Sequence, residues 1–236
     1  LEPISKDWKK FRVTVYDPRK MRAHHRQGRH RFLIARDILE ADLVVNVPKL
    51  KAHKKAGITC CLKNLIGING NKEYLPHHRK GARRVGRGGD SHENGSWLLW
   101  ALETALDGMN LRRDWPRFYR LCEYLVYGVL RVYRWIDPQA QLEGSWHGND
   151  TIWRTCLDLN RALLYADQTG RMQELPQREE ISIVDAIVAG QGEGPLAPDP
   201  LQTGAVFAAR NPAVGDLLGA RLLGFDVAKI PLLRHA

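Results

Sequence analysis

Hydrophobic positions along the chain fall into short apolar runs and longer stretches with helical spacing. Segments 42–48 (DLVVNVP) and 181–189 (ISIVDAIVA) are β-branched and almost wholly apolar, which predicts strands buried on both faces of a sheet. The run at 181–189 continues into a Gly-rich loop. Further strands are predicted over 11–17 and 204–209, and helices over 31–41, 96–109, 116–136 and 211–226, with another starting after Asn149 or Asp150. A short helix is also predicted around 60–65, closed by Gly67.

Strands and helices alternate along most of the chain, and this alternation predicts an α/β fold. We expect a mixed or mostly parallel sheet flanked by helices. The 236 residues are enough for a single α/β domain over 1–236, with a helical insertion or subdomain at 97–170. Because the first residue is not Met, we expect a processed piece or a fragment of a longer chain.

The net charge and the cysteine content indicate the kind of partner and the cellular compartment of the protein. The formal net charge of +10 favours anionic partners, or else a solvated basic face. Four cysteines lack CxxC spacing, so the chain carries no iron–sulfur cluster motif and no zinc knuckle. Together with the absence of a signal peptide, this favours a reducing, cytoplasmic location. The cysteines are Cys60, Cys61, Cys122 and Cys156.

One aromatic and basic segment, 117–135, is too interrupted by charge to span a membrane. It is expected either to pack an aromatic stripe against the core or to lie peripherally on a membrane surface. Nucleic acid is an unlikely partner. The basic runs at 49–55 and 79–87 could contact phosphates, but no helix-turn-helix, zinc finger or RNP pattern accompanies them.

The densest chemistry lies in 46–67, NVPKLKAHKKAGITCCLKNLIG. His53 and Lys63 both follow a predicted buried strand, and ligands of α/β sheets bind at the carboxyl edge of such strands. A lysine held among apolar neighbours can act as a base or nucleophile, and a histidine can move protons near neutral pH. The alternative is a lysine-rich surface loop with an incidental histidine. Candidate substrate-binding residues around them are Asn46, Lys49, Lys51 and Asn64.

A second candidate region is the glycine-rich stretch at 190–195, GQGEGP. Its final Pro195 prevents the helix that a dinucleotide site needs, so a Rossmann motif is rejected. Asp185 and Glu193 remain candidate catalytic or metal-binding carboxylates, unless the glycines only serve a turn. Asp216, on the last long helix, could point to the same edge or face water.

The adjacent pair His77 and His78 is a candidate for binding a divalent metal. Neighbouring residues of an extended segment point in opposite directions, so at most one of them is expected to face a given ion. The surrounding loop is basic, which opposes cation binding unless anionic ligands contribute.

Three ordered motifs give the chain a family resemblance: the stretch from Ala41 to His78, IVDAIVAGQGEGPL and NPAVGDLLGARLLGFD. They resemble the bacterial and archaeal family called domain of unknown function 362 (DUF362), over about 41–231. Many members carry ferredoxin-like iron–sulfur modules, whose cysteine runs this chain lacks. Where the family more often has DPVAVD, this chain has NPAVGD, and Gly215 is expected to weaken the helix there.

A more distant resemblance is to the nickel-pincer lactate racemases. In that family a histidine and the cofactor-bearing lysine are ten residues apart, like His53 and Lys63 here, and a histidine further on binds nickel. The likeness implies that Lys63 orients a cofactor or substrate, that His53 is a general acid/base, and that His77 or His78 is a ligand. Cys60, Cys61 and Leu62 replace the racemase glycines, so shared architecture is expected more than shared chemistry.

These observations lead to two functional hypotheses. The first is an enzyme, racemase/isomerase-like or oxidoreductase-associated, that uses proton transfer or metal-assisted chemistry on a small anionic substrate. Its catalytic residues are predicted to be His53, Lys63, Asp185 and Glu193. The alternative is a non-enzymatic binding protein that docks an acidic ferredoxin-like partner or an anionic surface through the same basic edge.

Overall fold

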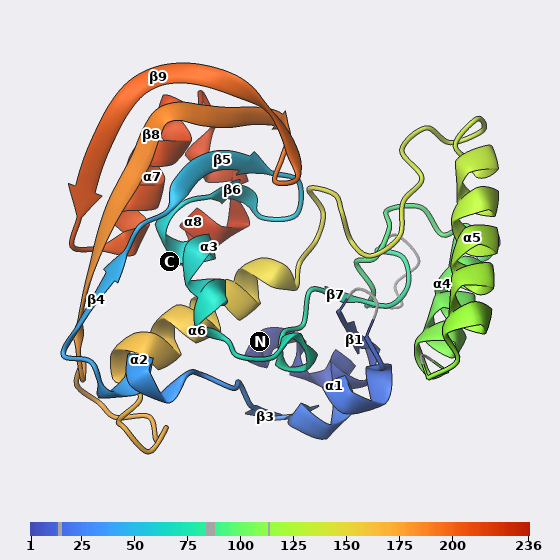
Figure 1. Cartoon of the computed structure of the whole chain (residues 1–236), viewed down its shortest axis with the longest axis horizontal. Coiled ribbons are helices and arrows are strands. Elements are labelled where there is room, and N and C mark those ends of the chain that lie inside the picture. The colour runs from blue at the N-terminus through green and yellow to red at the C-terminus, as the bar shows by residue number, and fades with distance from the viewer. Residues whose placement is uncertain (14–15, 84–87, 113) are drawn as a thin grey trace. The chain divides into compact units, whose positions relative to one another are not determined.

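The computed structural model describes residues 1–13, 16–83, 88–112 and 114–236, and they form two compact units. The first unit contains 1–32 and 71–152, and the second contains 33–70 and 153–236. Each unit is therefore built from two separate stretches of chain (Figure 1). The prediction of a single domain is not tested by this division, since compact units can belong to one domain.

The second unit contains a mixed five-stranded sheet, as predicted for an α/β fold. Its strands are β4 (Leu43–Asn46), β5 (Lys49–His53), β6 (Gly57–Thr59), β8 (Glu179–Glu193) and β9 (Ala197–Ala209). The long strand β8 is central. It pairs in parallel with β4 over its first part and with β5 further on, and β9 runs antiparallel along its other side. β6 is antiparallel to β5 and forms a hairpin with it.

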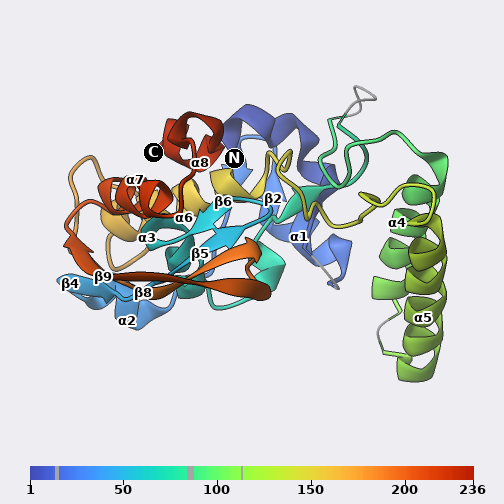
Figure 2. The same ribbon diagram turned by 90° about the horizontal axis from the view of Figure 1, so that it is seen from above.

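In the described residues, two helices pack on the same face of this sheet. Figure 2 shows α3 (Cys61–Asn64) and α7 (Pro212–Leu222) on the same side of the strands. Side chains alternate along β8, so that Ser182, Val184 and Ala186 are fully buried toward these helices. On the opposite face, which we call the open face, large apolar side chains are exposed. They are Leu43, Val45, Val47, Ile183, Ile187 and Val206.

The open face corrects the prediction that segment 42–48 is buried on both sides. Val44 and Asn46 are buried, but Val45 is 53 % exposed because no layer covers that face of the sheet in the described residues. The prediction of a Gly-rich loop after the strand at 181–189 is also wrong. The glycines belong to β8 itself and to its tight turn into β9, which begins seven residues earlier than the predicted strand at 204.

Shorter elements complete the second unit. The helix predicted over 31–41 is reduced to α2 (Arg36–Glu40), since Ile34 instead forms a β-bridge with Asn69. The short helix predicted after the Lys-rich stretch is α3, and a 3₁₀ turn continues from it through Gly67. The remaining elements are η2 (Leu65–Ile68), α6 (Ile152–Tyr165), η4 (Val227–Lys229) and α8 (Pro231–Arg234).

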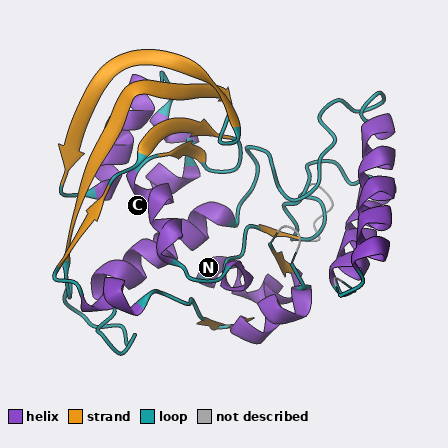
Figure 3. Ribbon diagram, in the orientation of Figure 1, coloured by secondary structure: helices purple, strands orange, loops and turns teal. Residues whose placement is uncertain are grey.

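The first unit is largely helical and loop-rich (Figure 3). Its two longest helices are α4 (Trp97–Asn110) and α5 (Pro116–Tyr133), and they pack on each other around Leu106, Val126 and Leu130. Of the strand predicted over 11–17, two residues form β1, and residues 14 and 15 lie outside the described part. The other elements are η1 (Glu2–Lys10), β1 (Phe11–Arg12), α1 (Pro18–His24), β2 (His25–Arg26), β3 (Arg29–His30), η3 (Lys72–Tyr74) and β7 (His78–Arg79).

The helical section at 97–170 is divided between the units. α4 and α5 belong to the first, whereas α6 belongs to the second from Trp153 onward. The helix predicted to start after Asn149 or Asp150 starts at Ile152, so neither residue is its N-cap. Asn149 Oδ1 instead accepts hydrogen bonds from the backbone N–H groups of Thr151 and Ile152 in the turn that leads into the helix.

Among the described helices, none combines the length and the apolar character needed to cross a membrane.

Candidate functional site

The short helix α3, which carries Lys63, is held in place by side chains from three other elements. A four-residue helix has little stability of its own and leaves most of its peptide groups unpaired. Asn46 on β4 donates to the carbonyl of Cys61 at 3.0 Å, and Asn160 on α6 donates to the carbonyl of Leu62 at 2.9 Å. Asp216 on α7 accepts from the Leu62 N–H at 3.2 Å. All three side chains are buried, so α3 has a well-defined position.

A chain of hydrogen-bonded polar groups extends from the exposed Asn64, at the end of α3, to buried groups of the sheet. Asn64 Nδ2 donates to Asn46 Oδ1 at 2.7 Å, and Asn46 Nδ2 also donates to Ser182 Oγ at 2.9 Å. Ser182 in turn donates to Glu180, whose pKa is raised by burial. The two predicted substrate-binding amides, Asn46 and Asn64, are thus brought together, but their contacts are with each other and with α3.

Lys63 itself is half-buried. Its Nζ makes no hydrogen bond or ion pair with the residues that the structure describes, unlike the polar groups that hold its helix. Its charge acts on the nearby thiol of Cys156. Burial raises the pKa of Cys156 to about 12, and the positive charge of Lys63 opposes this rise. The ammonium group is therefore available to a ligand.

His53 lies at the far end of β5 and has a structural task. Its Nδ1 accepts hydrogen bonds from the backbone N–H groups of Lys55 and Ala56, at 3.1 and 3.3 Å, and so closes the turn into β6. Because Nδ1 is the acceptor, the neutral ring carries its proton on Nε2. His53 pairs with Gly57 at the start of β6, whereas Lys63 is on α3, beyond the other end of that strand. The ten-residue spacing does not bring His53 to Lys63.

Asp185 lies on the open face of the sheet. It forms an ion pair with Lys49, 2.9 Å from Nζ to Oδ2, and the hydrogen bond from Lys49 is the main cause of its lowered pKa. Lys51 is also directed to this face, and its Nζ donates to the carbonyl of Pro195 at 3.3 Å. Strand alternation turns these side chains away from the helices, so they do not share a site with Lys63.

Glu193 is at the tip of the β8–β9 hairpin, where it forms an ion pair with Lys54. This end of β8 lies beside His53 at the carboxyl end of β5, since the Lys54 N–H donates to the Gly194 carbonyl at 3.3 Å. The four predicted catalytic residues therefore occupy three places in the second unit. Their roles stay predictions, but the arrangement favours Lys63 as the centre of a site.

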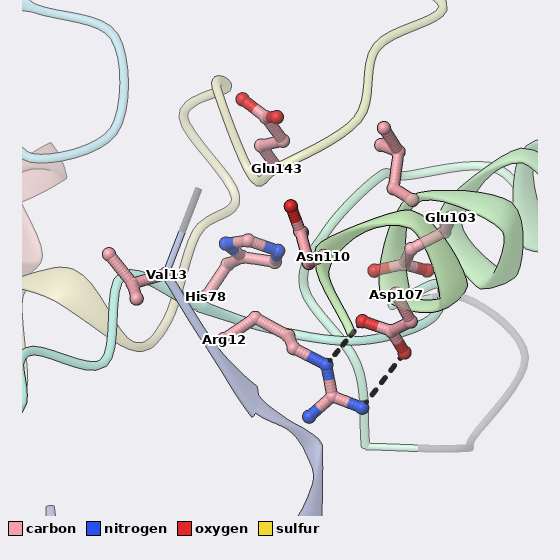
Figure 4. A pocket seen from close by; sticks show the side chains of 8 residues that line it. Arg12, Val13, His78, Glu103, Asp107, Asn110 and Glu143 are labelled. Atoms are coloured by element: carbon pink, nitrogen blue, oxygen red, sulfur yellow. Dashed lines mark hydrogen bonds and ion pairs between the residues drawn. The ribbon is translucent and has the colours of Figure 1, made fainter. Parts of the chain in front are cut away.

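His77 and His78 belong to the first unit. His77 Nδ1 lies 2.7 Å from the carbonyl oxygen of Leu75. His78 is buried and lines a cavity of about 20 Å³, which is the size of a single water molecule. Figure 4 shows its ring near Asn110, beside the ion pair of Arg12 and Asp107. Among the described residues neither histidine belongs to a group of three or more candidate metal ligands.

The residues that hold α3 were not all accessible from the sequence. From the sequence, Asp216 could either face the site or face water. In the structure its side chain is completely buried. Asn160 gave no signal, because one polar residue in an amphipathic helix is ordinary. The basic run at 79–87 was considered for phosphate contacts. Its residues 84–87 lie outside the described part, and Arg79 is committed to Asp7, Asp90 and Asp150.

The fold and this site define a class. It is an α/β protein in which a lysine that has no partner among the described residues lies on a short helix held by buried side chains. The chain belongs to the DUF362 family, a domain of unknown function, whose family model matches residues 4–221. No curated protein and no solved structure gives a significant match. The resemblance to lactate racemases thus stays a prediction.

Proposed function

We propose that the protein is an enzyme that acts on a small anionic substrate, with Lys63 as the group that binds it or transfers a proton to or from it. One observation carries this proposal. Lys63 has no hydrogen bond or ion pair among the described residues, yet three buried polar side chains fix the helix that presents it. Placing buried polar groups costs free energy, and such a cost is common where a functional group must be oriented.

The environment of Lys63 suits an anion. A lysine ammonium is a compact point charge with three donors, and a carboxylate or phosphate oxygen would satisfy it. Half-burial strengthens such an interaction relative to one in bulk water. In this proposal Lys63 acts without His53, whose Nδ1 is already used in the β5–β6 turn.

The alternative function, docking of an acidic partner through the basic strand β5, has less support. Lys49 and Lys54 are already paired with Asp185 and Glu193. Lys51 donates to a backbone carbonyl. These contacts reduce the positive field that would steer an acidic protein to this strand.

The proposal is tested with a panel of small carboxylates, phosphate esters and inorganic phosphate, each added to the protein during thermal unfolding. We expect at least one anion to raise the Tm of the wild type and of Lys49→Met, but not of Lys63→Met. Without ligand, Lys63→Met should change the free energy of unfolding by less than roughly 0.5 kcal/mol, as for other side chains without partners. A large loss of stability in that variant would make Lys63 structural and overturn the proposal.

A further inference from the structure

The adjacent residues Cys60 and Cys61 lie close to Asp216, which is on α7. The Sγ atoms of Cys60 and Cys61 are 3.7 Å apart, and a carboxylate oxygen of Asp216 lies within 4.8 Å of both. All three residues are fully buried. The sulfur–sulfur separation is far longer than the ~2.05 Å of a disulfide bond, so these are two free thiols.

The separation of the sulfurs matches a metal-bound pair. Two thiolates bound to one tetrahedral Zn²⁺ at ~2.3 Å lie about 3.7 to 3.8 Å from each other. The 3.7 Å between Cys60 and Cys61 needs no rearrangement to meet this requirement. A carboxylate oxygen is the usual third type of ligand beside sulfur and nitrogen. Two sulfurs and one oxygen also select a borderline or soft ion over Mg²⁺ or Ca²⁺.

Asp216 supplies an independent sign of a ligand. Its Oδ1 accepts the hydrogen bond from the Leu62 N–H. Its Oδ2 is buried and has no hydrogen bond of normal geometry among the described residues, and the side-chain donors that act on the carboxylate are the weak S–H groups of Cys60 and Cys61. A buried carboxylate oxygen without a partner is costly, and a bound cation would remove that cost.

Glycines on α7 make room for the two sulfurs. A Cβ atom at Gly215 would lie 2.6 Å from the Sγ of Cys61, and one at Gly219 would lie 3.2 Å from the Sγ of Cys60. Positions four apart share one face of a helix, so both glycines face α3. The Gly215 that distinguishes this chain from the usual family motif is thus explained by the cysteine pair beneath it.

We propose that Cys60, Cys61 and Asp216 form a buried binding site for one thiophilic divalent cation of the Zn²⁺ class. On binding, the two S–H bonds break, two metal–sulfur bonds form and both protons pass to solvent, with no change in oxidation state. Asp216 Oδ2 is the third ligand, and Oδ1 keeps its bond to α3 as the orienting contact. The site shares α3 with Lys63, since Cys61 is the first residue of that helix, but it does not depend on the function proposed for the lysine.

The test uses the full chain, freed of metal by dialysis against a chelator under reducing conditions. Titration with Co²⁺ should produce one equivalent of bound ion with a sulfur-to-cobalt charge-transfer band in the near ultraviolet, and Zn²⁺ should displace it. If the wild type binds no Co²⁺, or binds it without that band, this result is enough to overturn the proposal, and the variants are not needed.

Variants then locate the ion. The double variant Cys60→Ser/Cys61→Ser and the variant Asp216→Asn should each bind Zn²⁺ on the order of 100-fold more weakly or worse. The matched control is Cys122→Ser, a half-buried thiol on α5, which should bind like the wild type. Unchanged affinity in the double variant, or loss in Cys122→Ser, would place the ion elsewhere and contradict the assignment.

Discussion

At the scale of single residues, glycines decide how closely the strands approach. Gly194, in the turn between β8 and β9, packs directly against the backbone of β5. A Cβ atom there would lie 2.0 Å from the carbonyl oxygen of Ala52. A backbone atom in the middle of a sheet cannot move aside as a flexible side chain can. The glycine therefore serves close packing and not a phosphate cradle.

Replacing Gly194 by Ala should consequently destabilise the protein by roughly 1 to 3 kcal/mol, the usual effect of inserting an atom into a filled interior. The matched control is Gly108→Ala, within α4, where nothing lies within 4 Å of the added Cβ. That change should stabilise by roughly 0.4 to 1 kcal/mol, because alanine favours the helix. Urea unfolding measures both, and equal stability of Gly194→Ala and wild type would refute the packing argument.

The place of Lys63 on a short helix could be predicted from the sequence, but the side chains that surround it could not. Lys63 and its short helix follow from the apolar strand, the turn and the Lys-Asn pair. The role of His53 does not follow, because a hydrogen bond from a side chain to backbone N–H groups two and three residues on leaves no pattern. For the same reason Asn160 could not be assigned from the sequence, as its partner at Leu62 is 98 positions away.

At the scale of elements, periodicity predicted the helices α4, α5 and α7 better than it predicted the sheet. Helical spacing extends over many residues and places α4, α5 and α7 within a few positions of their observed limits. An apolar run such as 42–48 cannot show which face of a strand will be covered. Nor can it show that β4 and β5 both pair with one strand, β8, since that depends on the length of a hairpin distant in sequence.

Helix α5 combines a buried stripe with an exposed one. Val126 and Leu130 pack against α4, while a second apolar stripe at helical spacing faces solvent. Basic side chains accompany that stripe along the helix. The exposed apolar residues are Phe118, Leu121, Leu125, Val129 and Val132, and the basic ones are Arg117, Arg120, Arg131 and Arg134.

This combination predicts that α5 binds an anionic lipid surface, with the apolar stripe inserted and the arginines at the headgroups. The protein should sediment with vesicles that contain anionic phospholipid and not with purely zwitterionic ones. Leu121→Gln/Leu125→Gln should weaken this binding, whereas Val206→Gln, an equally exposed position on the open face, should not. No sedimentation with anionic vesicles at low salt would exclude this role of α5.

At the scale of the whole molecule, buried acids link stability to pH. Burial raises the pKa of Glu103, on α4, to about 7 from an ordinary value of 4.5. The folded state therefore keeps a proton between these values that the unfolded state releases. The resulting stabilisation is complete below about pH 4.5 and is lost as the pH rises toward 7.

Glu103→Gln should accordingly lose less stability than the wild type when the pH is raised from about 5 to about 8. Glutamine keeps an oxygen that can accept the Gly81 N–H bond to this side chain. Glu174→Gln, an exposed position, is the control and should follow the wild type. Chemical unfolding across this range measures the difference, and parallel pH profiles for wild type and Glu103→Gln would show that Glu103 ionises normally.

The arrangement of the chain into units could not be foreseen from local patterns. The sequence indicated a helical section at 97–170 inside an α/β chain. The structure assigns α4 and α5 to one unit and most of α6 to the other. Each unit gathers two distant stretches of chain, and long-range packing of this kind has no local signature. Membership of DUF362, matched over 4–221, supplies no activity.

The central claim is that Lys63, on its side-chain-held helix, binds the anionic substrate. Calorimetric titration of the most stabilising anion into wild type, Lys63→Met and Lys49→Met tests it most directly. Loss of a charged hydrogen bond costs about 1.5 to 3 kcal/mol, so Lys63→Met should bind roughly 10- to 100-fold more weakly, and Lys49→Met should match the wild type. If Lys63→Met binds the anion as tightly as the wild type, this account is contradicted. If only Lys49→Met loses affinity, the binding site lies on the open face instead.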